Sequence, residues 1–202
     1  MVPTFLAVIS LALLVIPGAV AIPLADCNCT GTINTDSTKY LCGDARLGPF
    51  ILPEKAPFSH MLYRYDPFGG LCPGEFLSKW TFANNNSYRY PDHDTRGFQI
   101  STTEKTYIDG NETLVVGMLL DRFGPESGKY LAPAYTPFAQ RSLPPLSLND
   151  SDYHVYKVTK NFTLLSGPTA AWFGQPGQGT QYWSGNAVKE MISAGNLTEV
   201  AI

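Results

Sequence analysis

The sequence predicts a β-dominated α+β fold, in which a disulfide-stapled N-terminal domain precedes the domain that carries the candidate site. Short runs rich in β-branched and aromatic residues recur along the chain, and clusters of Gly, Pro, Asn and Asp separate them. After residue 21, only Asn186–Ala194 has convincing helical spacing. All 4 cysteines lie in the N-terminal half. Few helices, many short strands and clustered cysteines together indicate this architecture.

Residues 1–21 predict a secretory signal peptide. Phe5–Ile16 is an apolar core too short to span a bilayer, and Ala19–Ala21 fits the small-residue cleavage rule. Cleavage is therefore expected before Ile22, and the protein is expected to be secreted, either extracellular or at the cell surface. N-x-S/T sequons agree with this route. They lie at Asn28, Asn85, Asn111, Asn149, Asn161 and Asn196. Asn161, beside an expected strand, is the one most at risk of lying too close to the core for modification.

The cysteines are Cys27, Cys29, Cys42 and Cys72. An even number in a secreted chain predicts disulfide bonds. Cys27 and Cys29 are too close to bond comfortably to each other, so each is expected to bond to Cys42 or Cys72. A zinc site is the alternative, but no histidine stands among them at finger spacing.

Residues 22–109 are expected to form the N-terminal domain. It is rich in Pro, Gly, Asn and Tyr, and it would fold poorly without its disulfides. Strands are expected at Met61–Tyr65, Leu77–Phe82 and Phe98–Thr102. Residues 108–111 are the expected joint to the second domain.

Residues 110–202 form the second predicted domain. Thr113–Leu120 is expected to be a buried strand, followed by strands at Tyr153–Thr159, Phe162–Leu165 and Thr180–Trp183. In the helix at 186–194, Val188, Met191 and Ile192 form the apolar stripe. Ser184 or Asn186 can cap its start, and Gly195 can end it.

Composition limits the function classes. The chain has 202 residues, 44% hydrophobic and 15% charged, which suits one packed domain or one with a smaller companion. The net charge of −3 argues against a general nucleic-acid binder. No later apolar run is long enough for a membrane span.

An ordered set of motifs follows Leu120, and no ordinary structural requirement asks for arginines, glutamines and aromatics among so many glycines and prolines. The motifs are D-R-F-G at 121–124, G-K-Y-L-A-P at 128–133, R-S-L-P-P at 141–145, Y-H-V-Y-K-V at 153–158, S-G-P at 166–168, W-F-G-Q-P-G at 172–177 and G-T-Q-Y at 179–182. Together they resemble the tuberculosis necrotizing toxin (TNT) domain and, within that family, the secreted fungal NAD glycohydrolases. The resemblance covers Val116–Ile202 and implies a TNT-like catalytic domain.

The resemblance implies cleavage of NAD+, and also of NADP+, to nicotinamide and ADP-ribose or its phosphate. Nicotinamide leaves as a neutral molecule, so this reaction needs no general acid and no pair of carboxylates. The site must instead hold the pyrophosphate, orient the ribose and place one water.

Arg122 and Arg141 are the candidate phosphate ligands, and Arg141 is also a catalytic candidate. A guanidinium binds a phosphate through two parallel hydrogen bonds. The resemblance places both in motifs where arginines of the family contact the dinucleotide. The alternative is a structural salt bridge with Asp121.

Three aromatic residues and one histidine are candidates for substrate binding. Tyr130 stands where the family has an aromatic residue that could stack on a substrate ring. Phe138 and Trp172 are further candidates for the same wall, with core packing as the alternative. His154 lies in a motif where the family has a histidine near the substrate, and a structural role is weighed equally. His60 and His93 are expected to be surface or loop residues.

Gln181 is the second catalytic candidate. Glutamine cannot take a proton, but its amide can orient a water or a ribose hydroxyl through both ends. The family's essential glutamine falls in this segment, and the G-T-Q-Y context points to Gln181. Gln175 and Gln178 are expected to belong to the loop.

The resemblance implies no organic cofactor, and no metal site is expected. Some fungal relatives carry calcium in an acidic tail, whereas this sequence stops at Ile202 with only Glu199 acidic nearby. The resemblance also implies a homodimer, with residues 22–109 contributing to dimerisation. Two alternatives stay open: ADP-ribosyl transfer or cyclisation in the same pocket, and a non-catalytic secreted surface module.

Overall fold

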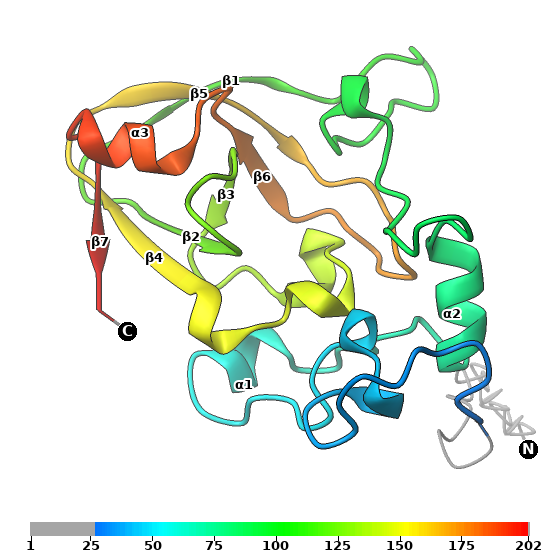
Figure 1. Cartoon of the computed structure of the whole chain (residues 1–202). Helices are drawn as coiled ribbons and strands as arrows, with labels where there is room; N and C mark the ends of the chain where they lie inside the picture. Colours follow the sequence, from blue (N-terminus) through cyan, green and yellow to red (C-terminus); the bar gives the residue numbers. More distant parts are fainter. Residues whose placement is uncertain (1–26, 202) are drawn as a thin grey trace, which may run out of the picture.

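The computed structural model describes residues 27–201, so the expected signal peptide and its cleavage site lie outside the described residues. Within that range the fold is built on one seven-stranded antiparallel sheet with the order β1-β5-β6-β3-β2-β4-β7 (Figure 1). The strands are β1 (Gly110–Leu114), β2 (Leu119–Phe123), β3 (Tyr130–Pro133), β4 (Tyr153–Val158), β5 (Phe162–Pro168), β6 (Thr180–Trp183) and β7 (Leu197–Val200). The β-dominated α+β class predicted from the sequence is confirmed.

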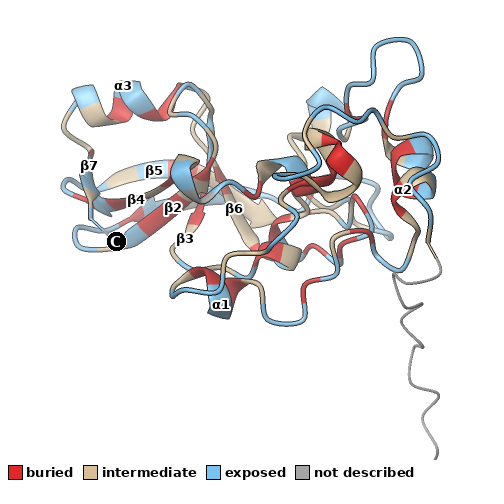
Figure 2. Ribbon diagram, turned by 60° about the horizontal axis from the view of Figure 1, so that its bottom comes forward, coloured by how far each residue is buried: buried red, intermediate tan, exposed pale blue. Residues whose placement is uncertain are grey.

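Helix α3 (Val188–Ser193) covers one face of the sheet (Figure 2). Its Val188 and Met191 pack with Leu120 and Tyr156, which are paired across β2 and β4. Tyr156 and Val188 are completely buried. This cluster draws all its members from Leu114 onward, so it belongs to the C-terminal part of the chain alone.

Two further clusters contain residues from both halves of the sequence. In one, Phe58 and Met61 of α1 (Phe58–Met61) pack with Phe123, Phe138 and Tyr153. The other lies under α2 (Pro73–Trp80). There, the buried side chains of the N-terminal half meet the ring of Phe173 from the segment that follows β5. The members of this third cluster are Leu47, Phe68, Phe76, Leu77, Tyr88 and Phe173.

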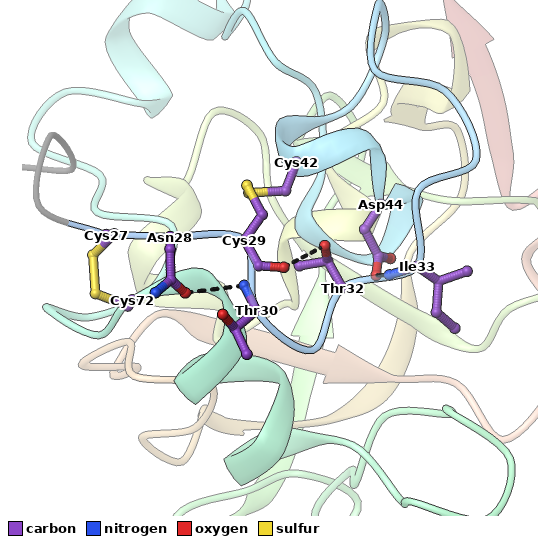
Figure 3. Close-up of a disulfide and its surroundings, with 9 residues drawn as sticks. All are labelled: Cys27, Asn28, Cys29, Thr30, Thr32, Ile33, Cys42, Asp44 and Cys72. Atoms are coloured by element: carbon purple, nitrogen blue, oxygen red, sulfur yellow. Dashed lines mark hydrogen bonds between the residues drawn. A yellow bond between two sulfur atoms is a disulfide. The ribbon is translucent and has the colours of Figure 1, made fainter.

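The N-terminal region is held by two disulfides, as expected from the cysteine count. Cys27 bonds to Cys72, and Cys29 bonds to Cys42 (Figure 3). The first bond ties the start of the described chain to the residue that precedes α2. Cys42 of the second bond lies within the short 3₁₀ helix η2 (Leu41–Gly43), which is followed by η3 (Ala45–Leu47), and η4 (His93–Thr95) comes later in the chain.

Two strands predicted in the N-terminal region are wrong, because one segment consists mostly of turns and the other is mostly helical. Met61 ends α1 and is followed by turns, and residues 77–80 lie in α2. Local chemistry starts α2: Pro73 occupies its first turn, and Glu75 accepts a hydrogen bond from the main-chain N–H of Cys72 (3.0 Å). The apolar residues Phe76, Leu77 and Trp80 then share one helical face. Residues 98–102 form isolated bridges in place of a strand, one from Phe98 to Thr169 and one from Ile100 to Tyr107.

The strand predictions in the C-terminal region are better. β4, β5 and β6 confirm three of them, whereas the expected strand at 113–120 is two strands joined by a turn around Gly117, whose φ is +97°. β3 and β7 were not predicted. The predicted helix at 186–194 is α3, but Ala187 stands at its N-cap without a side-chain hydrogen bond. The prediction that 186–194 would be the single helix is wrong, because α1 and α2 are helical as well and α2 is longer than α3.

The sequons lie at the surface of the structure. Asn28, Asn85, Asn111, Asn149 and Asn161 are exposed, and Asn196 is half-buried. Asn161, the one most at risk from the sequence, uses its Oδ1 to accept a hydrogen bond from the main-chain N–H of Val116 at 2.9 Å, and its amide nitrogen takes no part in that bond. Among residues 27–201, no helix combines the length and the apolar character that crossing a membrane requires.

Candidate active site

A cleft of about 540 Å³ brings together most of the residues predicted to bind substrate. It is lined by the β2–β3 hairpin, by residues 141–147, by the segment from Thr169 to Gln181, and by residues 90–97 of the N-terminal region. Arg122, Tyr130, Arg141, Trp172 and Gln181 all line it. A larger hollow of about 900 Å³ lies elsewhere, around residues 39–58 and 146–149, and it contains none of the predicted binding residues.

Arg122 enters the cleft from β2 and is held by main-chain carbonyls. Its Nε donates to the carbonyl of Pro125 (2.8 Å) and its Nη1 to that of Tyr130 (2.9 Å). Burial lowers the pKa of Arg122, and the nearby Tyr156 and Asp152 act in the opposite direction. The close fit depends on Gly128, because a Cβ at that position would lie 1.8 Å from Nη2 of Arg122. Neutral carbonyls orient this guanidinium without cancelling its charge.

Arg141 is held differently, by a buried carboxylate. Its Nη1 and Nη2 donate to the two oxygens of Asp121 at 2.5 and 2.7 Å, and its Nε donates to the carbonyl of Thr136 at 2.9 Å. The side chain of Arg141 is 7% exposed and that of Asp121 is fully buried. The hydroxyl of Tyr153 and the main-chain N–H of Tyr135 complete the shell of Asp121. The structural salt bridge weighed from the sequence therefore exists, and it forms part of the cleft wall.

Gln181 reaches the cleft from β6. Its Nε2 donates to the main-chain carbonyl of Arg96 at 2.8 Å. Because one end of the amide is engaged as a donor, Oε1 is left to accept a hydrogen bond. The other two glutamines of the segment are placed as expected for loop residues. Gln175 is buried and donates to the carbonyl of Asp66, and Gln178 is exposed and bonds to Gln99.

The aromatic candidates separate into two groups. Tyr130 and Trp172 line the cleft, and Nε1 of Trp172 donates to the carbonyl of Arg89 at 2.7 Å. Burial raises the pKa of Tyr130, against the opposing charge of Arg96. Phe138 is completely buried and packs edge-on against Phe123, with ring centroids 5.0 Å apart. The structure therefore places Phe138 in the core behind the cleft wall.

His154 lies outside the lining of the cleft, although it pairs with Arg122 across β4 and β2. Its Nδ1 is 2.7 Å from Oε1 of Glu199, and its Nε2 is 3.2 Å from Oδ1 of Asp152. Burial alone would lower the pKa of His154, but the hydrogen bonds and charges of these two carboxylates raise it. Donor atoms of Glu126, His154 and Glu199 lie within 4.8 Å of one another, a spacing compatible with a metal ion. Both ring nitrogens are already at hydrogen-bond distance from carboxylates, so we interpret the cluster as a histidinium held between acids.

The residues 90–97 that line the cleft were not predicted, and His93 was expected to be a surface or loop residue. Ala170 donates its main-chain N–H to the carbonyl of Gly97, and Gln99 donates to that of Pro168, both at 2.9 Å. This ladder fixes residues 97–99 beside the end of β5 and so brings Arg96 to Gln181. The segment lies before the matched motifs, and only its cluster of charged residues beside tyrosine and proline could have drawn attention to it.

The fold and the cleft define a disulfide-containing α+β protein with a basic, aromatic-walled pocket on an antiparallel sheet. Residues 113–200 match the family model described as tuberculosis necrotizing toxin. The chain is 48% identical over 177 residues to the conidial surface nicotinamide adenine dinucleotide glycohydrolase of Aspergillus fumigatus, covering 84% of this chain and 74% of that protein. The chain therefore belongs to the tuberculosis necrotizing toxin (TNT) domain family.

Solved structures with detectable similarity are more distant. The tuberculosis necrotizing toxin in complex with its immunity factor is 20% identical, with a TM-score of 0.39, over 75% of this chain and 92% of that one. Rhs1-CT in complex with its cognate immunity protein is 12% identical, with a TM-score of 0.36, over 57% of this chain and 95% of that one.

Proposed function

We propose that this chain is an NAD+ glycohydrolase that cleaves the nicotinamide–ribose bond, releasing nicotinamide and ADP-ribose. The observation that carries the proposal is the 48% identity to a protein named for this activity, over 84% of the chain. The cleft lined by Arg122, Tyr130 and Gln181 supports it independently. We extend the proposal to NADP+, whose reacting bond is the same.

The reaction makes modest chemical demands, and the cleft can meet them. The bond joins C1 of ribose to a positively charged ring nitrogen, so nicotinamide leaves without being protonated. Positive charge then develops on the ribose, and one water must attack it. The protein must hold the dinucleotide, keep stray water out and orient that water.

Four residues of the cleft have proposed roles. Gln181 accepts a hydrogen bond from a ribose hydroxyl or from the attacking water through its free Oε1. Arg122 binds the phosphates, and Tyr130 and Trp172 form an aromatic wall for a base. The catalytic role expected for Arg141 remains a prediction, and its bond to Asp121 favours an action through the shape of the cleft wall.

The test is product analysis with a matched pair of glutamine variants. The secreted chain is incubated with NAD+, and nicotinamide, ADP-ribose and cyclic ADP-ribose are separated chromatographically. We expect nicotinamide plus ADP-ribose from the wild type, and a loss of about a hundredfold or more in Gln181→Ala. Gln178→Asn, on the exposed turn before β6, is the control and should retain activity. Intact NAD+ after long incubation with folded protein would refute the proposal, and a cyclic product would favour the cyclase alternative.

We also propose that the protein is secreted to the cell exterior or surface, glycosylated and homodimeric. The surface name of the Aspergillus fumigatus relative and the two disulfides support the location. The exposure of five sequon asparagines supports glycosylation. Glycosidase treatment followed by mass measurement, and light scattering of the secreted protein, test the last two properties.

A further inference from the structure

Three arginines line the cleft, and they differ in how much of their charge is available. Arg141 is bound at two nitrogens by the carboxylate of Asp121, so its positive charge is neutralised within the wall. Arg122 keeps its charge but spends its Nε and one Nη1 hydrogen on main-chain carbonyls. A dinucleotide brings two negatively charged phosphates. The arginines of the matched motifs offer only one uncompensated positive charge between them, that of Arg122.

Arg96 has the free guanidinium. It lies in residues 90–97, outside the range that matches the family model. Among residues 27–201 no carboxylate is within 4.0 Å of its guanidinium, and no hydrogen bond from it is formed. Asp92 also lines the cleft, but its Oδ1 accepts the main-chain N–H of Asp94 at 3.1 Å.

The position of Arg96 is nevertheless well defined. Its Cζ lies 4.5 Å from the centroid of the Trp183 ring. A guanidinium over an aromatic ring uses its face for that contact, and its N–H groups, which lie in its plane, stay available to an anion. The positive charge also acts on the nearby hydroxyl of Tyr130. Aromatic stacking thus orders the side chain without consuming its hydrogen bonds.

The main chain of the same residue holds the candidate catalytic group. The carbonyl of Arg96 accepts the hydrogen bond from Nε2 of Gln181, and Arg96 itself adopts a left-handed conformation with φ of +50°. A ligand gripped by the guanidinium of Arg96 is therefore fixed relative to Gln181 through a single residue.

We propose that Arg96 is a substrate-binding residue that donates hydrogen bonds to the pyrophosphate of the dinucleotide, so that the N-terminal region supplies one of the site's phosphate ligands. This inference rests on the proposed function for the identity of the ligand. The phosphate contact itself can be measured without turnover.

The experiment is calorimetric titration of the full secreted chain with ADP and, separately, with adenosine, which lacks the phosphates. Arg96→Gln removes the charge and keeps the main-chain carbonyl that holds Gln181. We expect it to weaken ADP binding about tenfold or more and to leave adenosine binding unchanged. Arg96→Lys should fall between the two because it restores charge without the planar fork.

Arg64→Gln is the matched control. Arg64 also has a positive φ, of 58°, and its guanidinium also lies over an aromatic ring, 5.3 Å from the centroid of Tyr63, but it is outside the cleft. It should bind ADP like the wild type. Equal ADP affinity in Arg96→Gln and wild type, equal loss for ADP and adenosine, or a wild type that binds no ADP would each overturn the inference. If ADP binding depends on Arg96 but NAD+ is not cleaved, the phosphate subsite stands and the proposed function fails.

Discussion

At the scale of single residues, the cleft shows how the partner of an arginine determines what the arginine can do. Asp121 and Arg141 form a buried pair whose removal on one side would leave an uncompensated charge. Arg122 instead faces neutral carbonyls. The motifs predicted both arginines as phosphate ligands. A motif gives only residue types, and it does not show which carboxylate packs against which guanidinium in the folded protein.

Gly128 offers a sharp test of the role of Arg122. Its φ is not in the left-handed region, so alanine is tolerated by the backbone, but the new Cβ would lie 1.8 Å from Nη2 of Arg122. The guanidinium is the far end of a flexible side chain and can move aside. We therefore expect Gly128→Ala to lower activity on NAD+ about tenfold to a hundredfold, while the free energy of unfolding changes by less than ~1 kcal/mol.

Gly110→Ala is the control for this prediction, because it also lies on regular backbone and its Cβ would meet no atom within 4 Å. Steady-state kinetics and urea denaturation of the three proteins give both quantities. Full activity in Gly128→Ala would show that the present position of Arg122 is not needed for the reaction.

At the scale of elements, β7 is a four-residue edge strand whose attachment combines backbone pairing with one charged contact. It pairs with β4, and Glu199 in β7 lies against His154 in β4. His154 has a pKa raised above its ordinary value of 6.5. The resulting stabilisation is fully present below that value and is lost as the pH rises through the raised pKa.

Glu199→Gln should therefore lower the melting temperature more at about pH 5.5 than at about pH 8.5, since a larger fraction of His154 is charged at the lower value. The side chain of Glu199 is 52% exposed, so the loss should be at most about 1 kcal/mol, or roughly 3 °C. Glu104→Gln, at an exposed loop glutamate, serves as the control and should show no such pH dependence. An equal loss at both pH values would mean that a neutral hydrogen bond, and no charge, holds β7.

The elements also show what the sequence can and cannot predict. β4 was predictable because four of its six residues are buried Tyr or Val, and β6 because its Thr, Tyr and Trp all favour strands. β7 was not, since Leu197 is its only fully buried residue and its remaining stability comes from pairing with β4. The segment at 77–82 is rich in residues that favour a strand, but the cap formed by Cys72 and Glu75 starts a helix that runs into it. Likewise Arg96 joins the site through a backbone ladder that leaves no pattern in the sequence.

At the scale of the whole molecule, the two predicted domains share their hydrophobic interior. Phe58 of α1 lies with its ring centroid 5.2 Å from that of Tyr153 and 6.2 Å from that of Phe123. Phe173 packs edge-on against Trp80, with centroids 5.4 Å apart. The division at residue 110 therefore separates the part of the chain that carries the matched motifs from the part that does not. Whether the two parts also fold separately can be tested directly.

We predict that residues 110–202, expressed alone, do not form a cooperative folded unit. Without the N-terminal region, Phe123, Phe138 and Tyr153 would lose the side chains that cover them, and Gln181 would lose the carbonyl of Arg96. Near-ultraviolet circular dichroism and dye binding should reveal loose packing and exposed apolar surface, with no turnover of NAD+. In the full chain, Phe58→Ala should cost about 3 kcal/mol by the same loss of cover, whereas truncation of the exposed Phe50, which is 59% accessible, should cost little. A fragment with a cooperative melting transition and NAD+ cleavage would show instead that the C-terminal region is a self-sufficient domain, and it would limit the role of the N-terminal region to secretion, dimerisation or both.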